Sequence, residues 1–273
     1  MRNLSISRAW DESKAIIARE GRLFTSVALA LVALPALVTG VIRPGGVSDA
    51  STPIWVDVVM IFASLVALAG QLALIRLAIG PSITVGEAIR HGLTRMPVYL
   101  LAAILIIAAL LLLAVPFGFA LVALGVPMDR TPTALTPGAA LVIVIYFAAA
   151  TYLGVKMCLS ATAASAEPIG AIAIIKRSWD LTDGHWWRLF GFLLLFFIAA
   201  VVLLVGAGAA VGAVDAILLG PLDPMSASAL VLALVQAVLN TLITTVLAVM
   251  LARIYVQLSG NDAAALTVPK SGT

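Results

Sequence analysis

Three polar side chains recur at every fourth position inside a long apolar stretch near the end of the chain. They are Gln236, Asn240 and Thr244, and this spacing places them along one face of a helix. A fourth polar side chain, Gln71, lies near the middle of an earlier apolar stretch. Amides and hydroxyls in such places hydrogen-bond a neighbouring helix or line a pathway. None of them ionises, as a proton relay would require, so the spacing favours helix association and leaves a transport pathway as the alternative.

Two glycines suggest a close helix contact. Gly208 and Gly212 form a Gly-x-x-x-Gly spacing, which lets two helix backbones approach each other. We expect them to pack a helix against a neighbour, within the chain or in a second copy. A hinge for gating is the alternative.

Groups with classical catalytic chemistry are few. The chain has two histidines, His91 and His185, and one cysteine, Cys158. Asp183 precedes His185 by two positions, but no nucleophile or oxyanion donor is evident beside this pair. The sequence also has no zinc-ligand spacing, phosphate loop or nucleotide fingerprint. We therefore expect a protein that is not an enzyme, with no cofactor and no metal site.

The composition indicates where these residues must lie. Hydrophobic residues make up 63% of the 273 positions and charged residues only 11%, and the mean hydropathy is +1.16. A soluble domain carries about 25% charged residues. A water-soluble globule of this size could not bury so much apolar side chain, so the sequence predicts an integral membrane protein.

Six apolar stretches are each about as long as a transmembrane helix. They run over 23–42, 54–79, 97–126, 139–155, 186–214 and 227–258. Their continuous hydrophobicity favours helices, because strands of a membrane barrel would alternate in shorter segments. The predicted fold is an all-α polytopic transmembrane bundle, one domain over 1–273 with a flexible tail at 261–273.

The distribution of positive charge predicts the orientation. Of the 16 lysines and arginines, all but Arg43 and Arg130 lie on the side that carries both termini. The positive-inside rule then places both termini in the cytoplasm, and we expect a bacterial inner (plasma) membrane. The orientation in the membrane accounts for the excess of basic residues, so nucleic acid is not an expected partner.

The segments before the first, third and fifth stretches resemble one another. Each reads as a short amphipathic helix that leads to an aromatic or basic residue at the membrane surface. This similarity predicts three parallel repeats of an interfacial helix and two spans, over 1–80, 81–165 and 166–260. Shared chemistry at membrane entrances, without common origin, is the alternative.

One motif has a family resemblance. The segment with Ser178, Trp179, Leu181 and Gly184 resembles the Ser-Trp-x-Leu-x-x-Gly motif of the glycerophosphoryl diester phosphodiesterase membrane-domain family. In some relatives this membrane region is fused to a catalytic barrel, and such barrels take about 250 residues. This chain has no room for one, so the resemblance implies a stand-alone membrane domain without the phosphodiesterase activity.

Positively charged residues near the membrane surface suggest lipid contacts. Lys156 follows the fourth stretch, and we expect its side chain to extend to the lipid headgroups. Four arginines could form a basic collar that attracts anionic lipids, namely Arg76, Arg177, Arg188 and Arg253. The expected partners are membrane lipids, with a protein partner or a homo-oligomer as further candidates.

The function we expect is a non-enzymatic scaffold or accessory role in envelope or lipid physiology. The alternative is a transporter or permease-like subunit that moves a lipid or another amphiphile.

Overall fold

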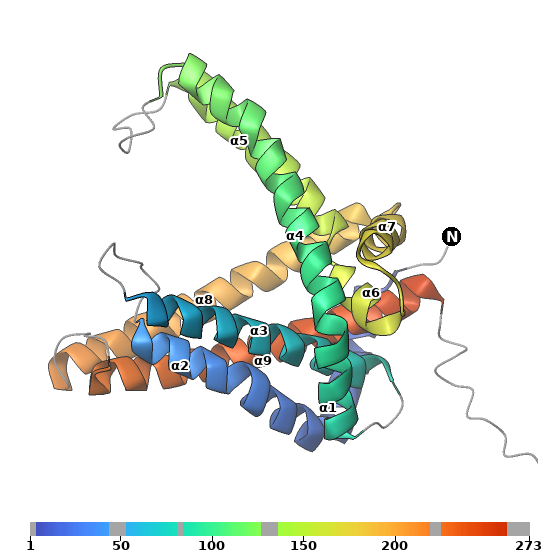
Figure 1. Cartoon of the computed structure of the whole chain (residues 1–273), viewed down its shortest axis with the longest axis vertical. Helices are drawn as coiled ribbons and strands as arrows, with labels where there is room; N and C mark the ends of the chain where they lie inside the picture. Colours follow the sequence, from blue (N-terminus) through green and yellow to red (C-terminus); the bar gives the residue numbers. More distant parts are fainter. Residues whose placement is uncertain (1–3, 44–52, 81–83, 127–135, 219–224, 261–273) are drawn as a thin grey trace, which may run out of the picture.

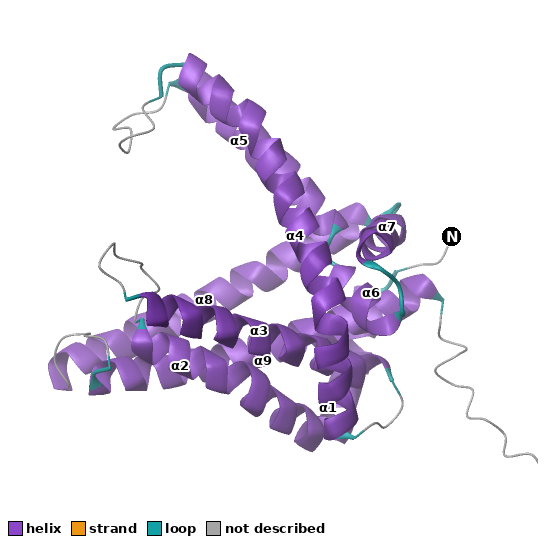
Figure 2. Cartoon of the chain, viewed as in Figure 1, coloured by secondary structure: helices purple, strands orange, loops and turns teal. Residues whose placement is uncertain are grey.

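The structure, a computed structural model, describes residues 4–43, 53–80, 84–126, 136–218 and 225–260, and every regular element in these ranges is a helix (Figure 2). Six helices there are long and apolar enough to cross a membrane. The chain is therefore an all-α integral membrane protein, as its composition predicts. The expected flexible tail and Arg130 lie outside the described residues.

The first span is one long helix with two irregularities. It runs through α1 (Ile6–Ala28), a π-helical turn η1 (Leu29–Ala33) and α2 (Leu34–Ile42). Glu20 leaves helical geometry (φ −114°, ψ 18°), so the amphipathic segment and the apolar segment meet at a kink. The π turn ends just before Pro35. Proline has no amide hydrogen to donate, and its ring pushes away the carbonyl one turn earlier, which explains the local change in hydrogen bonding.

The next three spans correspond to the predicted apolar stretches, except that the second of them begins 12 residues before its stretch. They are α3 (Ile54–Ile79), α4 (Val85–Ala123) and α5 (Pro137–Lys156). A capping box between Thr84 and Glu87 starts α4. The 39 residues of α4 include both the predicted interfacial helix and the predicted span. The amphipathic part and the membrane-spanning part of α4 therefore form one continuous helix.

Two short helices precede the last pair of spans. They are α6 (Ser160–Ala166), which the sequence pattern does not predict, and α7 (Ala171–Thr182). The last two spans are α8 (Trp186–Leu218) and α9 (Ala227–Ser259). Gly184 separates α7 from α8 at a φ of +76°, a conformation that favours glycine.

The spans form two groups that diverge from one end (Figure 1). The helix α9 lies at the centre of the larger group, against α1, α2, α3 and α8. The hairpin of α4 and α5 leaves this group at a wide angle, and α6 and α7 lie where the two groups meet (Figure 1). The first part of α4 packs against α3, which joins the groups.

The first and the last described residues of the chain lie at the end where the groups meet. The backbone amide of Ser5 donates to Oε1 of Gln257 at 3.2 Å, and Arg188 donates to the carbonyl of Leu4 at 3.1 Å. We call this the terminal end, defined by the helix ends at Ile6, Ile79, Lys156, Trp186 and Ser259 (Figure 1). The opposite loop end holds the helix ends at Ile42, Ile54, Ala123, Pro137 and Ala227.

The buried core is concentrated at the terminal end. The buried part of α3 is its second half, around Leu72–Ala78, and the largest buried part of α9 is Ala248–Gln257. Nearly all of α6 is buried between them. Large apolar side chains on α4, α5 and α8 are mostly exposed, as expected where lipid surrounds a helix.

The three proposed repeats enter the membrane differently. The first unit has a kink at Glu20, the second runs straight through Pro97, and the third breaks at Gly184. The repeat therefore stays a prediction, since the described helices do not establish it.

Three glycines permit close crossings that the sequence analysis does not single out. A methyl group on Gly70 of α3 would lie 2.6 Å from the β-carbon of Leu31, and one on Gly40 would lie 2.9 Å from that of Ala233. A methyl group on Gly92 of α4 would collide with the backbone carbonyl of Ala69. Since backbone cannot easily give way, Gly92 fixes the distance between α3 and α4.

We predict that Gly92→Ala destabilises the protein by about 1–3 kcal/mol through this overlap. The control is Gly86→Ala on the same helix, where an added methyl group meets nothing within 4 Å and the change should be neutral or stabilising by up to about 1 kcal/mol. Thermal unfolding in detergent micelles measures both. Equal stability of the two variants would contradict the close α3–α4 crossing.

Candidate intramembrane cavity

A cavity of about 340 Å³ lies between α2, α3, α8 and α9 in the half of the bundle nearer the loop end. Ligand pockets typically measure about 300–1,000 Å³. Its polar lining includes Thr39 and Arg43 from α2 and its C-cap, and Gln236 and Asn240 from α9. Small and apolar residues complete the wall, namely Ala36, Gly40, Met60, Leu204, Leu232, Ala233 and Ala237.

An ion pair stands where this cavity approaches the loop end. The guanidinium of Arg43 donates to Oδ1 of Asp57, at the start of α3, at 3.0 Å. The Arg43 side chain is 12% exposed and that of Asp57 is 58% exposed. Both signs of charge therefore lie close together beside the cavity.

Gln236 uses its side chain to join two spans. Its Nε2 donates to the backbone carbonyl of Leu204 on α8 at 3.1 Å. In an α-helix the amide four residues later, that of Gly208, bonds to the same carbonyl. A methyl group on Gly208 would lie 2.6 Å from Nε2 of Gln236, so the absent side chain gives the glutamine access to α8.

Asn240 stands one turn further along α9 in a different setting. Its side chain is exposed, lines the cavity, and has no hydrogen-bond partner within the described parts of the chain. The hydroxyl of Thr39 donates to the carbonyl of Ala36 on its own helix at 3.0 Å. The amide of Asn240 is therefore available to a molecule in the cavity, whereas Thr39 is already bonded.

The other predicted polar positions lie elsewhere. Gln71 is half-buried on α3 and Thr244 is half-buried on α9, and neither lines this cavity. Gly212 has open space around it and makes no close contact. The structure thus joins Gln236, Asn240 and Gly208, and it separates them from Gln71, Thr244 and Gly212.

Arg43 is the residue of this cavity that the sequence analysis missed as a site residue. It was counted there only as one of the two cations on its side of the membrane. Lysines and arginines are rare on that side of the membrane, and this rarity could have indicated Arg43. A positive charge that goes against the positive-inside rule needs another explanation, such as a site.

The family-like motif lies at the terminal end and surrounds the end of α5. The hydroxyl of buried Ser178 donates to the carbonyl of Lys156 at 2.7 Å. The ring of Trp179 lies 4.9 Å from Nζ of Lys156, and Asp183 forms an ion pair with this ammonium. Leu181 is buried, and Gly184 supplies the left-handed turn. These residues hold α5 to α7.

The prediction that Lys156 extends to the lipid headgroups is wrong. Its side chain is only 3% exposed, because Asp183 and the Trp179 ring satisfy the charge within the protein.

The predicted basic collar is mostly used inside the chain. Arg177 pairs with Glu167 at 2.9 Å, and Arg253 pairs with Glu12 at 2.7 Å. Glu12 lies on the amphipathic part of α1. Burial acts against ionisation of this carboxyl, but hydrogen bonds from Arg253 and Arg8 outweigh it and lower the pKa of Glu12.

The chain matches the family model described as "Domain of unknown function (DUF7847)" over residues 4–258, and it belongs to this family. No curated protein and no solved structure matches the chain. The matched description names no activity, so the resemblance of the Ser178–Gly184 segment to phosphodiesterase membrane domains stays a prediction. Within the described residues, no group of three or more His, Cys, Asp or Glu side chains could hold a metal ion.

We predict that Asp183→Asn lowers the free energy of unfolding by about 2 kcal/mol, because it leaves the buried ammonium of Lys156 without its counter-charge. The control is Asp11→Asn, which breaks an exposed pair with Lys14 and should cost less than about 1 kcal/mol. Unfolding in detergent micelles compares the two. A cost for Asp183→Asn no larger than the control would show that the Lys156 pair does not hold α5.

Proposed function

We propose that this protein is a non-enzymatic membrane protein that binds an amphiphile, with an accessory role in the lipid physiology of its membrane. The observation that carries the proposal is the unpartnered amide of Asn240 in a cavity of about 340 Å³. A polar group kept at membrane depth without an internal partner is costly unless it meets a ligand or water.

The chemistry of the cavity favours a molecule with a polar head and an apolar body. Arg43 lines the cavity at the loop end, where it is paired with Asp57 beside the cavity, and Asn240 offers a donor and an acceptor deeper in. The remaining wall is largely small and apolar, as expected of a surface that receives hydrocarbon. A zwitterionic lipid headgroup matches this mixed lining best.

Binding without passage agrees better with the packing than transport does. The cavity occupies the half near the loop end, while α3 and α9 are densely buried at the terminal end. A transporter would have to open this dense end. Flux of a lipid in liposomes, abolished by Asn240→Leu, would favour the transport alternative.

We predict that Asn240→Leu lowers the amount of amphiphile retained by the gently solubilised protein about tenfold, the effect of one lost polar contact of about 1.4 kcal/mol. Native mass spectrometry measures the retained molecules. Gln71→Leu is the matched control, since it removes an amide from a span but not from the cavity. Equal retention in the two variants, or no retained amphiphile in the unaltered protein, would contradict the proposal.

The proposed orientation has both termini in the cytoplasm of a bacterial cell, with the protein in its inner membrane. Cys158 packs partly buried against the core and is a poor probe. Two exposed positions serve better once Cys158 is replaced by alanine. These are Ser7, near the terminal end, and Ile54, at the loop end.

We predict that an impermeant thiol reagent applied to intact cells labels Ile54→Cys but not Ser7→Cys. The physical reason is the concentration of lysine and arginine at the terminal end. Lysed cells, in which both variants should react, provide the control. Labelling of Ser7→Cys from outside would reverse the orientation.

A further inference from the structure

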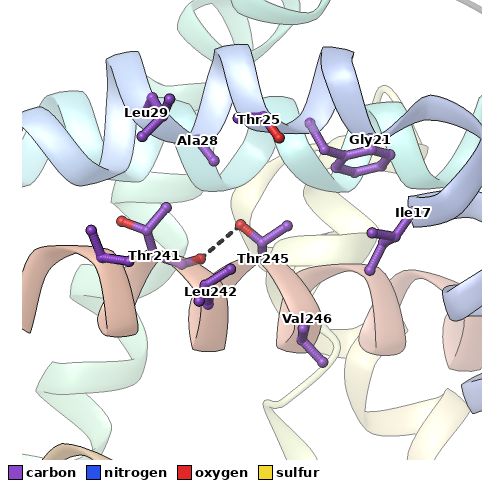
Figure 3. A pocket seen from close by; sticks show the side chains of 11 residues that line it. Ile17, Gly21, Thr25, Ala28, Leu29, Thr241, Leu242, Thr245 and Val246 are labelled. Atoms are coloured by element: carbon purple, nitrogen blue, oxygen red, sulfur yellow. Dashed lines mark hydrogen bonds between the residues drawn. The ribbon is translucent and has the colours of Figure 1, made fainter. Parts of the chain in front are cut away.

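A second hollow, a groove of about 180 Å³, runs between α1 and α9 and is separate from the cavity at Asn240 (Figure 3). Figure 3 shows α1 above and α9 below, with the groove between them. From α1 its wall includes Ile17, Gly21 and Thr25, from η1 it includes Leu29, and from α9 it includes Thr241 and Thr245. Gly21 directly follows the kink at Glu20.

The groove is lined mostly by apolar side chains, and two of its three hydroxyl groups are bonded to their own helix. The hydroxyl of Thr241 donates to the carbonyl of Ala237 at 2.6 Å, and that of Thr245 donates to the carbonyl of Thr241 at 2.7 Å. Both of these hydroxyls are therefore bonded to their own helix. Figure 3 shows the bond of Thr245. The groove fits an apolar chain better than a polar solute.

The part of the groove beyond the kink corresponds to most of one leaflet of a bilayer. Gly21, directly after the kink, and Leu29 in η1 are eight positions apart, which is about 12 Å at 1.5 Å per residue. A hydrocarbon core of about 30 Å gives roughly 15 Å per leaflet. The groove runs from the terminal end into the membrane, as an acyl chain of that leaflet would.

The charges at the terminal end of the groove favour an anionic headgroup. Arg19 pairs with Glu20 at 2.9 Å, and Arg253 pairs with Glu12. Arg22 follows Gly21 directly, is exposed, and has no ion-pair partner in the described ranges. Its positive charge is thus left for a ligand beside Gly21, which forms part of the groove wall.

We propose that this groove holds one acyl chain of an anionic phospholipid from the leaflet at the terminal end, with the lipid phosphate at Arg22. The site is independent of the cavity at Asn240. A lipid held there would lie between α1 and α9.

Photo-crosslinking tests the site on the full-length protein. The protein is reconstituted in phosphatidylcholine vesicles that contain a minor fraction of phosphatidylglycerol with a diazirine in its acyl chain. Peptide mass spectrometry should find adducts in the α1 and α9 groove segments, about fivefold above those from a phosphatidylcholine probe with the same chain, as one cation predicts. Equal adducts from the two probes would overturn the headgroup assignment.

Gly21 lines the groove, and an added β-carbon there meets nothing within 4 Å, so Gly21→Leu has room to fill the groove. We expect it to lower groove adducts at least about fivefold by taking the space of the acyl chain. The matched control is Gly191→Leu, on an exposed and equally open position of α8. Adducts in Gly21→Leu equal to those in Gly191→Leu would overturn the acyl-chain site.

Two further variants separate the parts of the proposal. Thr25→Phe fills the groove one turn along and should reproduce the loss of adducts even if Gly21→Leu folds poorly. Arg22→Gln should keep the adducts but remove the preference for phosphatidylglycerol, and an unchanged preference would overturn the role of Arg22. Asn240→Leu should leave groove labelling unchanged, which distinguishes this site from the proposed cavity ligand.

Discussion

The C-terminal end of α6 determines how the two groups of helices meet. A helix leaves its last carbonyls without intrahelical partners, and α6 is buried, so protein side chains must bond to them. Arg95 of α4 donates to the carbonyls of Ala164, at 2.9 Å, and of Glu167. His91 Nε2 donates to the carbonyl of Ser165 at 2.9 Å. The Glu167 carboxylate then accepts from Arg177 of α7 and from Tyr255 of α9. Three helices, α4, α7 and α9, are thus connected through one short helix that carries little hydrophobic signal of its own.

This connection explains why the two ends of the bundle differ. At the terminal end, charged side chains bond to backbone groups and to each other, which requires dense packing around them. Towards the loop end, the helix backbones satisfy their own hydrogen bonds and lipid covers the apolar side chains. Dense packing between the spans is therefore not required in this half. The cavity at Asn240 lies in this less constrained half, and the hairpin of α4 and α5 diverges there (Figure 1).

The spans were predictable from sequence because hydrocarbon thickness is a strong constraint on composition. The predicted stretch 54–79 coincides with α3, and 227–258 differs from α9 by one residue. Within the site, the spacing indicated Gln236 and Asn240 but could not show which neighbours they meet. The burial of Lys156 was unpredictable for the same reason, since its partner Asp183 lies on a separate segment. Short α6 has small residues without periodicity, so only tertiary packing makes it a helix.

The two amides on α9 show how one sequence pattern can serve two purposes. Gln236 faces a carbonyl of α8 that the missing side chain of Gly208 leaves accessible, so its polarity is used in holding two spans together. Asn240 has a shorter side chain and lies one turn further along, where the described chain offers it no partner. A stripe built only for helix association would bond both amides, because an unbonded amide in hydrocarbon opposes folding. The retained polarity of Asn240 therefore supports the proposed ligand, and the Arg43–Asp57 pair beside the same cavity would lie next to a charged head of that ligand.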